Sequence, residues 1–265
     1  MSSSVPSKST RPVALVTGPT SGLGAGFANK LASLGYDLVL VARDEERLAA
    51  LAADLDRRYG AKSEILPADL ATAEGRDDVA RRLDKGVQFL VNNAGFGLTG
   101  EFWTLDPEVL QSQLDVNVTA VMQLTRAALP SMIASAKGRI INVASVAGLV
   151  SGRGSTYSAS KAYVISFTEG LAGGLSGTGV EIQALCPGFV HTEFHERAGI
   201  AMDLPKVLWL NVDQVVATSL DDLEKGKILS IPGVQYKVLT AASRVIPKRV
   251  VRGINNVVGK GRGRT

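Results

Sequence analysis

Residues 13–24 read Val13-Ala-Leu-Val-Thr-Gly-Pro-Thr-Ser-Gly-Leu-Gly24, and this stretch decides the fold. Its first five residues are mostly apolar and partly β-branched, which predicts a buried strand ending at Thr17. Gly18, Gly22 and Gly24 follow at the spacing G-x-x-x-G-x-G. Glycines permit a tight turn and let backbone N–H groups at a helix start approach a diphosphate. The turn therefore favours nucleotide binding over a glycine-rich turn without a ligand.

Strand-like and helix-like patterns alternate along most of the chain. We expect strands at 13–17, 37–42, 63–66, 87–91, 139–144, 180–185 and 228–231, and helices at 27–34, 45–59, 76–83, 107–128 and 156–175. Strands that alternate with helices at this spacing form right-handed βαβ units, which build a parallel sheet covered by helices on both faces. The sequence therefore predicts an α/β fold with a doubly wound parallel sheet of about seven strands.

The composition of the 265-residue chain changes only near its C-terminus, so we expect one α/β domain. We place a disordered lead-in at 1–11, the domain at 12–235 and a basic extension at 236–265. The single cysteine, Cys186, excludes an internal disulfide and fits a reducing, cytoplasmic location. One cysteine and two histidines argue against a structural zinc site, and we expect no metal. No segment is long and apolar enough to predict a spanning helix.

The basic charge of the chain is concentrated in the extension. Residues 236–265 contain eight Lys or Arg and no acid, which leaves a net charge of −4 on residues 1–235 within the total of +4. This distribution argues against a nucleic-acid-binding face. Two interpretations of the extension stay open. It could be a helix that packs on its own chain or on a partner subunit, which we favour because the apolar stretch is short. It could also make peripheral contact with an anionic membrane.

The end of the second predicted strand bears on which dinucleotide the chain would bind. An acid there holds the ribose 2′-hydroxyl of NAD, whereas an arginine accommodates the 2′-phosphate of NADP. Ala42 supplies no acid, and Arg43 can form a forked contact with a phosphate, so we favour NADP(H) over NAD(H). Asp44 is the residue that could reverse this preference. Arg43 could also be a solvated residue at a helix start.

The segment Tyr157-Ser-Ala-Ser-Lys161 places a phenol and an ammonium four residues apart. In a helix, residues i and i+4 share one face about one turn apart. A cation beside a phenol stabilises the phenolate and lowers a pKa that is normally about 10. The pair therefore predicts a proton donor that works near neutral pH.

Four features together resemble the short-chain dehydrogenase/reductase family: the glycine segment at 17–24, Asn92-Asn-Ala-Gly95, Ser145, and Tyr157 with Lys161. The match runs in consistent order over roughly residues 11–195. The resemblance implies a single Rossmann-type domain that transfers a hydride between a nicotinamide and a carbonyl or alcohol. It also implies a homodimer or homotetramer, formed through the two helices that contain Asn117 and Tyr157.

By this resemblance the catalytic residues are Asn117, Ser145, Tyr157 and Lys161. Tyr157 is the general acid/base, while Lys161 lowers its pKa and contacts the nicotinamide ribose. Ser145 hydrogen-bonds the substrate oxygen and stabilises charge that develops there. Asn117 holds a water that links Lys161 to solvent. Each has a plainer interpretation when taken singly: Ser145 could cap the following turn, and Asn117 could satisfy a backbone carbonyl.

The resemblance also implies a cofactor-binding set that extends beyond the glycine turn. Ser21 departs from the pattern of many NADP-binding members, which have Lys or Arg at that place, so Arg43 is left as the main candidate for the 2′-phosphate. The whole set is Gly18, Thr20, Ser21, Gly22, Leu23, Gly24, Arg43, Asp69, Leu70, Asn93, Ala94, Gly95, Tyr157, Lys161, Pro187, Gly188, Val190 and Thr192.

The substrate pocket is expected at the carboxyl edge of the sheet, after the fifth and sixth strands. Its expected lining is mostly apolar, so we expect a small-molecule ketone, aldehyde, fatty acyl or sterol-like substrate. The competing hypothesis is an NADP(H)-binding regulatory or membrane-surface protein that uses the fold without turnover, and the retained Ser145 and Tyr157 argue against it. The expected lining is Val146, Ala147, Gly148, Leu149, Val150, Phe189 and the segment 194–210, which includes Trp209.

Overall fold

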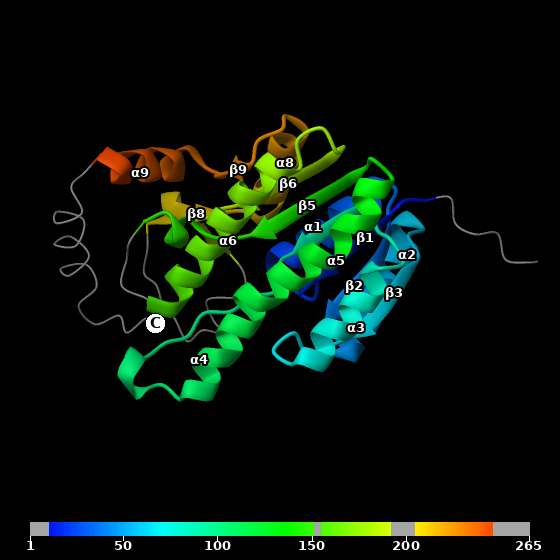
Figure 1. The fold of residues 1–265 in the computed structure, drawn as a ribbon, viewed down its shortest axis with the longest axis horizontal. Helices are drawn as coiled ribbons and strands as arrows, with labels where there is room; N and C mark the ends of the chain where they lie inside the picture. Colours follow the sequence, from blue (N-terminus) through cyan, green and yellow to red (C-terminus); the bar gives the residue numbers. More distant parts are fainter. Residues whose placement is uncertain (1–10, 151–154, 192–204, 246–265) are drawn as a thin grey trace, which may run out of the picture.

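Seven strands form one parallel sheet in the order β3-β2-β1-β4-β5-β6-β9 (Figure 1). The computed structural model describes residues 11–150, 155–191 and 205–245. The strands are β1 (Val13–Thr17), β2 (Asp37–Ala42), β3 (Ser63–Pro67), β4 (Phe89–Asn92), β5 (Gly138–Val143), β6 (Val180–Leu185) and β9 (Leu229–Ser230). The predicted doubly wound parallel sheet is confirmed, with the strand order reversing between β1 and β4.

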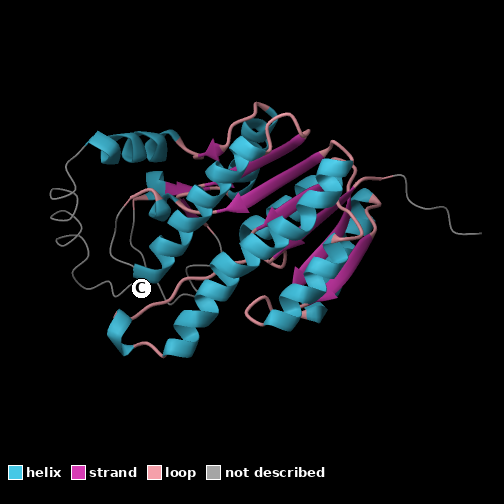
Figure 2. Cartoon of the chain, in the orientation of Figure 1, coloured by secondary structure: helices cyan, strands magenta, loops and turns pink. Residues whose placement is uncertain are grey.

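Helices cover both faces of this sheet (Figure 2). They are α1 (Gly22–Ser33), α2 (Glu45–Tyr59), α3 (Ala73–Leu83), α4 (Pro107–Leu114), α5 (Val121–Ala134), α6 (Ser155–Gly174), α8 (Val212–Glu224) and α9 (Val234–Val245). Apolar side chains of α1, α2 and α8 pack on one face, while those of α3, α5 and α6 pack on the other. The strands β1, β2, β4, β5 and β6 are mostly buried, because helices cover both faces of a parallel sheet, whereas the edge strand β3 has only half-buried and exposed residues.

Local signals in the sequence explain where several helices begin and end. The Asp44 carboxylate accepts from the Arg47 N–H to cap α2, and Gly60 ends that helix in the left-handed conformation. Thr72 caps α3 by accepting from the Gly75 N–H. Asp106 caps α4, whose first residue is a proline. The spacing of apolar residues along the chain predicts where strands and helices lie, and the capping residues determine where the helices begin and end.

The predicted single helix at 107–128 is wrong in its interior and at its end. A π-helical turn, η2 (Asp115–Ala120), separates α4 from α5, and α5 continues to Ala134. A π turn adds one residue to a helical turn without removing its apolar pattern, so periodicity alone does not reveal it. Asn117 lies inside η2 and is buried.

Two short strands form a separate parallel pair that the sequence did not predict, because two residues are too few to show a period. They are β7 (Phe189–Val190) and β8 (Trp209–Leu210). The segment between them includes residues 192–204, which lie outside the described residues. The pair therefore marks the two roots of this segment.

The expected boundary between residues 235 and 236 falls inside α9. Tyr236 and Thr240 of this helix are buried, and Tyr236 joins the apolar cluster formed by α1, α2 and α8. The first part of the expected extension therefore packs on its own chain, in agreement with the interpretation we favoured. The cause is a long-range contact of one aromatic side chain, which composition does not reveal. Residues 246–265 lie outside the described residues.

Arg11, which we assigned to the disordered lead-in, is held by the domain. Its guanidinium donates to several backbone carbonyls, including those of Gly35, Tyr59 and Gly60, and lies 3.5 Å from the carboxylate of Asp37. The described domain therefore begins at Arg11, and residues 1–10 lie outside the described part of the chain.

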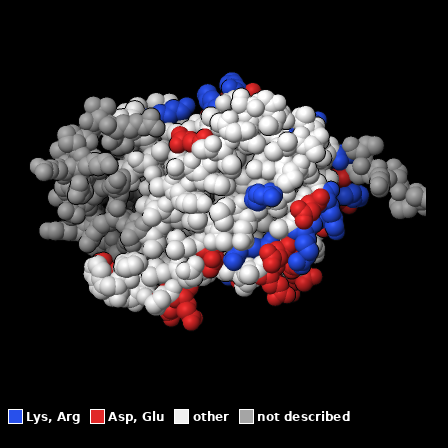
Figure 3. Space-filling view, viewed as in Figure 1, with Lys and Arg blue, Asp and Glu red and all other residues white. Residues whose placement is uncertain are grey.

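Charged side chains are unevenly distributed over the surface. Figure 3 shows that, on this face, they gather over α2, α3 and β3 and are sparser toward α9. Within residues 11–150, 155–191 and 205–245, no helix combines the length and the apolar character needed to cross a bilayer.

Candidate active site

The predicted site residues gather at the carboxyl edge of the sheet. The glycine turn follows β1, Asn93 follows β4, Ser145 follows β5 and Pro187 follows β6. All these strands are parallel, so their carboxyl ends meet at one edge, where ligands of open α/β sheets bind. Helix α6 brings Tyr157 and Lys161 to the same edge, beside η3 (Val146–Gly148).

Each glycine of the turn after β1 has a steric reason. Gly18 and Gly22 have φ angles of 63° and 54°, which residues with a side chain rarely adopt. A Cβ atom on Gly24 would lie 2.0 Å from the carbonyl oxygen of Gly18. Ser21, the residue before α1, makes no side-chain cap bond. The first N–H groups of α1 and this tight turn therefore fit a dinucleotide diphosphate.

A hydrogen-bond network joins the glycine turn to the end of β4. The Asn93 amide donates to the carbonyl oxygens of Thr17 and Gly18 at 2.9 and 3.0 Å. The Thr17 hydroxyl accepts from the N–H groups of Asn93 and Ala94 at 3.0 and 2.9 Å. The Asn93 side chain therefore shapes the turn. Thr17 is not among the predicted site residues, although a hydroxyl at the end of a strand is a signal for such a role.

Arg43 is exposed at the end of β2, beside the glycine turn. Asp44, the residue that could have reversed the cofactor preference, uses its carboxylate as the cap of α2, at 3.0 Å from the Arg47 N–H. A second guanidinium is close to this place, because Arg47 Nη2 donates to the Thr20 carbonyl oxygen at 3.0 Å. Arg47, four residues beyond Arg43, is not among the predicted cofactor-binding residues.

Asp69 and Leu70 follow β3 and form a tight turn. The Asp69 carboxylate accepts from the Ala71 N–H at 3.0 Å, and the Leu70 side chain is buried. The buried Arg76 donates to the carbonyl oxygens of Leu70 and Ala71. Leu23, from the glycine turn, is half-buried and packs on the apolar cluster of α1, α2 and α8.

Lys161 is buried below the sheet edge. Its ammonium Nζ donates to the Val143 carbonyl oxygen at 2.8 Å and lies 5.9 Å from the ring centre of Tyr157. Burial lowers the pKa of Lys161 from 10.5 to about 8. Tyr157 is half-buried on the same face of α6. The structure thus places the predicted cation against the predicted phenol.

Asn117 connects the π turn to the end of β4. Its Oδ1 accepts from the Phe96 N–H at 3.0 Å, and its Nδ2 donates to the Phe96 carbonyl at 2.9 Å and to Ser160 Oγ at 3.3 Å. A Cβ on Gly95 would lie 3.0 Å from Asn117 Oδ1 and 3.3 Å from Lys161 Nζ. Asn117 and Lys161 therefore approach the same small space, which only a glycine leaves open.

Ser145 caps the turn that follows β5, as its plainer interpretation proposed. Its Oγ accepts from the Ala147 N–H at 3.1 Å. Acceptance by the oxygen leaves the hydroxyl proton able to donate to another oxygen, so the cap does not prevent the expected catalytic role. The neighbouring Cys186 is fully buried, and burial raises the pKa of its thiol to about 12, which keeps it neutral.

The loop after β6 is held by a residue from far along the chain. The Tyr236 hydroxyl accepts from the Phe189 N–H at 3.0 Å and donates to the Leu208 carbonyl oxygen. The Val190 side chain is buried, so only its backbone is left to meet a ligand. The Pro187 carbonyl accepts from the Val146 N–H, which ties this loop to the turn of Ser145. Thr192, the last predicted contact, lies outside the described residues.

Aromatic side chains surround the start of this loop. The Trp209 indole stacks on the His191 ring at a centroid distance of 4.5 Å and meets the Phe189 ring at 5.9 Å. Leu149 and Val150, also expected to line the substrate pocket, are half-buried after η3. Residues 194–204 of the expected lining lie outside the described residues. The described part of the lining is apolar and aromatic.

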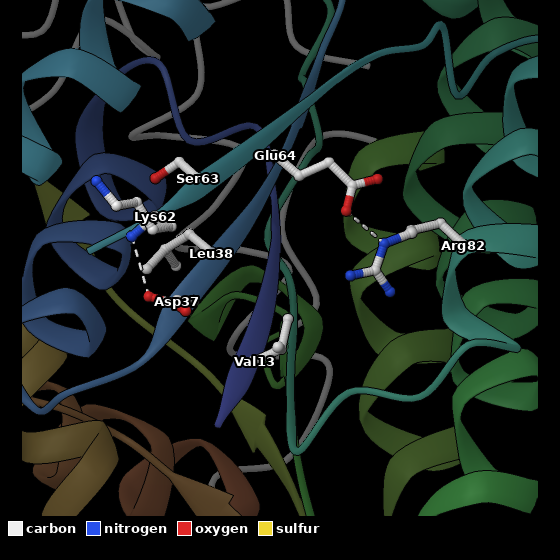
Figure 4. A pocket seen from close by; sticks show the side chains of 7 residues that line it. All are labelled: Val13, Asp37, Leu38, Lys62, Ser63, Glu64 and Arg82. Carbon is white, nitrogen blue, oxygen red and sulfur yellow. Dashed lines mark hydrogen bonds and ion pairs between the residues drawn. The ribbon is translucent and has the colours of Figure 1, made fainter. Parts of the chain in front are cut away.

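A cavity of about 280 Å³ lies at the opposite edge of the sheet, near the amino ends of β1, β2 and β3 (Figure 4). Arg82 pairs there with Glu64 at 2.7 Å, and Asp37 accepts from the Lys62 N–H. Ser63 and Glu64 are neighbours on one strand and therefore point to opposite faces of the sheet, so the polar groups do not converge. This cavity is separate from the catalytic edge.

Comparison with known proteins agrees with the family resemblance that the sequence motifs indicate. The sequence model of the family described as short chain dehydrogenase matches residues 12–202. A protein of Streptomyces violaceoruber, named as a ketoacyl reductase of the granaticin polyketide synthase, is 40% identical over 198 residues, which cover 72% of each chain.

Two solved structures are similar to the whole described fold. A short-chain dehydrogenase from Sphingobium yanoikuyae in complex with NADPH is 36% identical, with a TM-score of 0.81 over 88% of this chain and 94% of the other. A short-chain dehydrogenase/reductase from Burkholderia phymatum in complex with NAD is 29% identical, with a TM-score of 0.76 over 88% and 92%. Relatives of this chain thus bind either nicotinamide dinucleotide.

Proposed function

Because this chain belongs to the short-chain dehydrogenase/reductase family, we propose that it reduces apolar carbonyl compounds with NADPH, using Tyr157 as the general acid. Membership makes it an oxidoreductase that acts on carbonyl or alcohol groups with a nicotinamide cofactor. The choice of NADP over NAD, the apolar substrate and the roles of single residues are the parts that we propose.

The preference for NADP(H) is supported by the charges around the end of β2. Arg43 is exposed there, and Arg47 reaches the Thr20 carbonyl from the first turn of α2. The Asp44 carboxylate, the acid that would favour a free ribose hydroxyl, is engaged in capping α2. A guanidinium binds a phosphate by a forked, charge-assisted contact, so two of them beside one turn favour a 2′-phosphate.

The proposed chemistry assigns one task to each catalytic residue. The cofactor supplies the hydride. Tyr157 donates its proton to the substrate oxygen, while the Lys161 ammonium, 5.9 Å from the Tyr157 ring centre, stabilises the phenolate that remains. The Ser145 hydroxyl donates to the same oxygen as negative charge develops on it. Asn117 positions Lys161 through the segment at Gly95 and Phe96.

The apolar substrate class is supported by the described part of the pocket. Phe189, Trp209 and Leu149 supply aromatic and aliphatic surface after β5 and β6. The relative reported above, from Streptomyces violaceoruber, is named as a ketoacyl reductase, and this name indicates an acyl substrate. A ketone or aldehyde with an aliphatic or ring body fits such a lining better than a small charged compound.

Association of subunits is a further part of the proposal. Val109 of α4, Met122 and Ile133 of α5, and Tyr163 of α6 are exposed on the outer side of the domain. These helices include the ones that the family uses for dimers and tetramers. Light scattering of the purified protein would give the mass, and a monomer at micromolar concentration would contradict this part.

The observation that carries the proposal is the buried Lys161 ammonium against the Tyr157 ring. Its test is Tyr157→Phe, assayed with NADPH and a panel of aliphatic and aromatic ketones, with Tyr163→Phe on the same helix as the control. We expect Tyr157→Phe to lower kcat by roughly 100-fold to 10,000-fold while NADPH still binds, because only the proton donor is removed. Full turnover by Tyr157→Phe would overturn the mechanism. Tight NADPH binding without turnover of any carbonyl by the wild type would favour the regulatory alternative.

A further inference from the structure

Helix α9 has one buried and one exposed face. Tyr236 and Thr240 are 2% and 4% exposed, whereas Val234 and Val238 are 73% and 63% exposed. At 3.6 residues per turn, the two valines lie on the side of the helix opposite the buried pair. The helix is therefore anchored to the domain by one face and presents an apolar stripe on the other.

Two further aliphatic side chains are exposed next to this stripe. Leu239 follows Val238, roughly 100° further around the helix, and is half-exposed. Val207 is exposed and held beside α9, because Gln235 Nε2 donates to its carbonyl oxygen at 3.1 Å. We call Val207, Val234, Val238 and Leu239 the α9 patch. Single exposed apolar side chains are ordinary, but a group of them on one element marks a contact surface.

All the charged residues that follow α9 in the sequence are cations. Residues 246–265 contain six Lys or Arg and no acid, and Lys237 is exposed on α9 itself. An apolar helix face joined to a cluster of cations has the composition that binds an anionic lipid surface. We propose that the α9 patch docks the protein on an anionic membrane, whose negative charge complements Lys237 and the cationic composition of the sequence after α9.

Two other occupants fit the α9 patch less well. A nucleic acid would use the cations but not four aliphatic side chains, since its affinity comes mainly from phosphate contacts. A second copy of the chain would need an interface of about 800 Å² per partner, and four aliphatic side chains around one helix cover much less.

The position of the α9 patch gives the docking a consequence for the active site. Through Tyr236, helix α9 is bonded to Phe189 and Leu208, the roots of the segment between β7 and β8. These roots lie at the carboxyl edge of the sheet, on the same side as α9 in Figure 1. Docking through the α9 patch would therefore hold the catalytic edge close to the lipid surface. The proposal does not depend on which carbonyl compound is the substrate.

The test is flotation of the full chain with vesicles of phosphatidylcholine, with and without phosphatidylglycerol, at low and high salt. We compare the wild type with Val234→Ser/Val238→Ser, and with Leu34→Ser as a control at an exposed leucine on the far end of α1. We expect binding to the anionic vesicles only, weakened by salt, reduced roughly tenfold in the double variant and unchanged in the control. Circular dichroism verifies that the variants are folded.

Three results would overturn the proposal. The first is anionic-vesicle binding that is absent in the wild type or unchanged in Val234→Ser/Val238→Ser. The second is a loss of oligomer mass in the double variant without loss of vesicle binding, which would assign the α9 patch to a second copy. The third is binding to a DNA or RNA duplex that is tighter than binding to the vesicles. Flotation does not require turnover, so these results are independent of the proposed reductase activity.

Discussion

The Tyr236 ring occupies the space beside Gly188, where a Cβ would lie 2.0 Å from its Cζ atom. Only glycine therefore fits at position 188 while α9 packs on the domain in this way. The hydroxyl of the same tyrosine bridges the Phe189 N–H and the Leu208 carbonyl. One side chain from the C-terminal helix thus holds both roots of the segment between β7 and β8.

Replacement of Tyr236 by phenylalanine keeps the ring and removes the bridge. We expect Tyr236→Phe to lower the free energy of unfolding by about 1–3 kcal/mol, because two backbone groups lose their partner in a largely buried place. Urea unfolding measures this loss. Tyr163→Phe, at an exposed tyrosine of α6, is the control and should change stability by less than about 0.5 kcal/mol. Equal stability of the two variants would contradict the bridge.

Gly24→Ala tests the fit of the glycine turn to a diphosphate. The new methyl group would collide with the Gly18 carbonyl oxygen, so the turn must open. We expect calorimetric NADPH binding to weaken at least about 100-fold, because the N–H groups of α1 move away from the ligand. Gly170→Ala is the matched control, since it lies in helix α6 with nothing within 4 Å of its Cβ, and it should be neutral or slightly stabilising. Unchanged NADPH affinity in Gly24→Ala would remove the turn from the cofactor site.

Arg43→Ala tests the selectivity for the 2′-phosphate. We expect the affinity for NADPH to fall roughly 10-fold to 100-fold and that for NADH to stay constant, because a charge-assisted contact to the phosphate is lost. Arg57→Ala, at an exposed arginine later in α2, is the control for loss of one positive charge. An equal loss for both cofactors in Arg43→Ala would mean that the arginine supports the fold of the turn and does not read the phosphate.

The buried ammonium of Lys161 makes the stability of the domain depend on pH. The folded protein releases this proton near pH 8, whereas an unfolded lysine keeps it up to its ordinary pKa of 10.5. Between these values the unfolded state binds more protons, so stability rises with pH. Relative to Lys161→Met, we expect the free energy of unfolding of the wild type to rise by about 1 kcal/mol from about pH 7 to about pH 9.

Urea unfolding of both proteins at the two pH values measures this difference. Lys62→Met, at an exposed lysine, should show no comparable dependence on pH. A wild-type advantage that falls with rising pH would mean that Lys161 is stabilised as a cation, against the effect of its burial.

Most of the fold could be predicted because its signals are local. The β1, β2, α2 and β6 bounds follow directly from runs of apolar residues and from capping residues such as Asp44 and Gly60. The π turn around Asn117 and the pair β7–β8 could not be predicted in this way. Each is set by contacts with neighbouring elements, which leave no period in the chain.

By itself the sequence determined the parallel sheet and the candidate site residues at its carboxyl edge, because strand ends and an i, i+4 pair are properties of short segments. Only the tertiary structure decided how those residues are held. In the structure the buried Lys161 ammonium donates to the Val143 carbonyl, and the Asn93 amide donates to the glycine turn. The Asp44 carboxylate caps α2, and the Tyr236 ring packs beside Gly188. These decisions rest on contacts between residues that, except for the Asp44 cap, are far apart in the chain. Only the packing of the whole domain specifies such pairs.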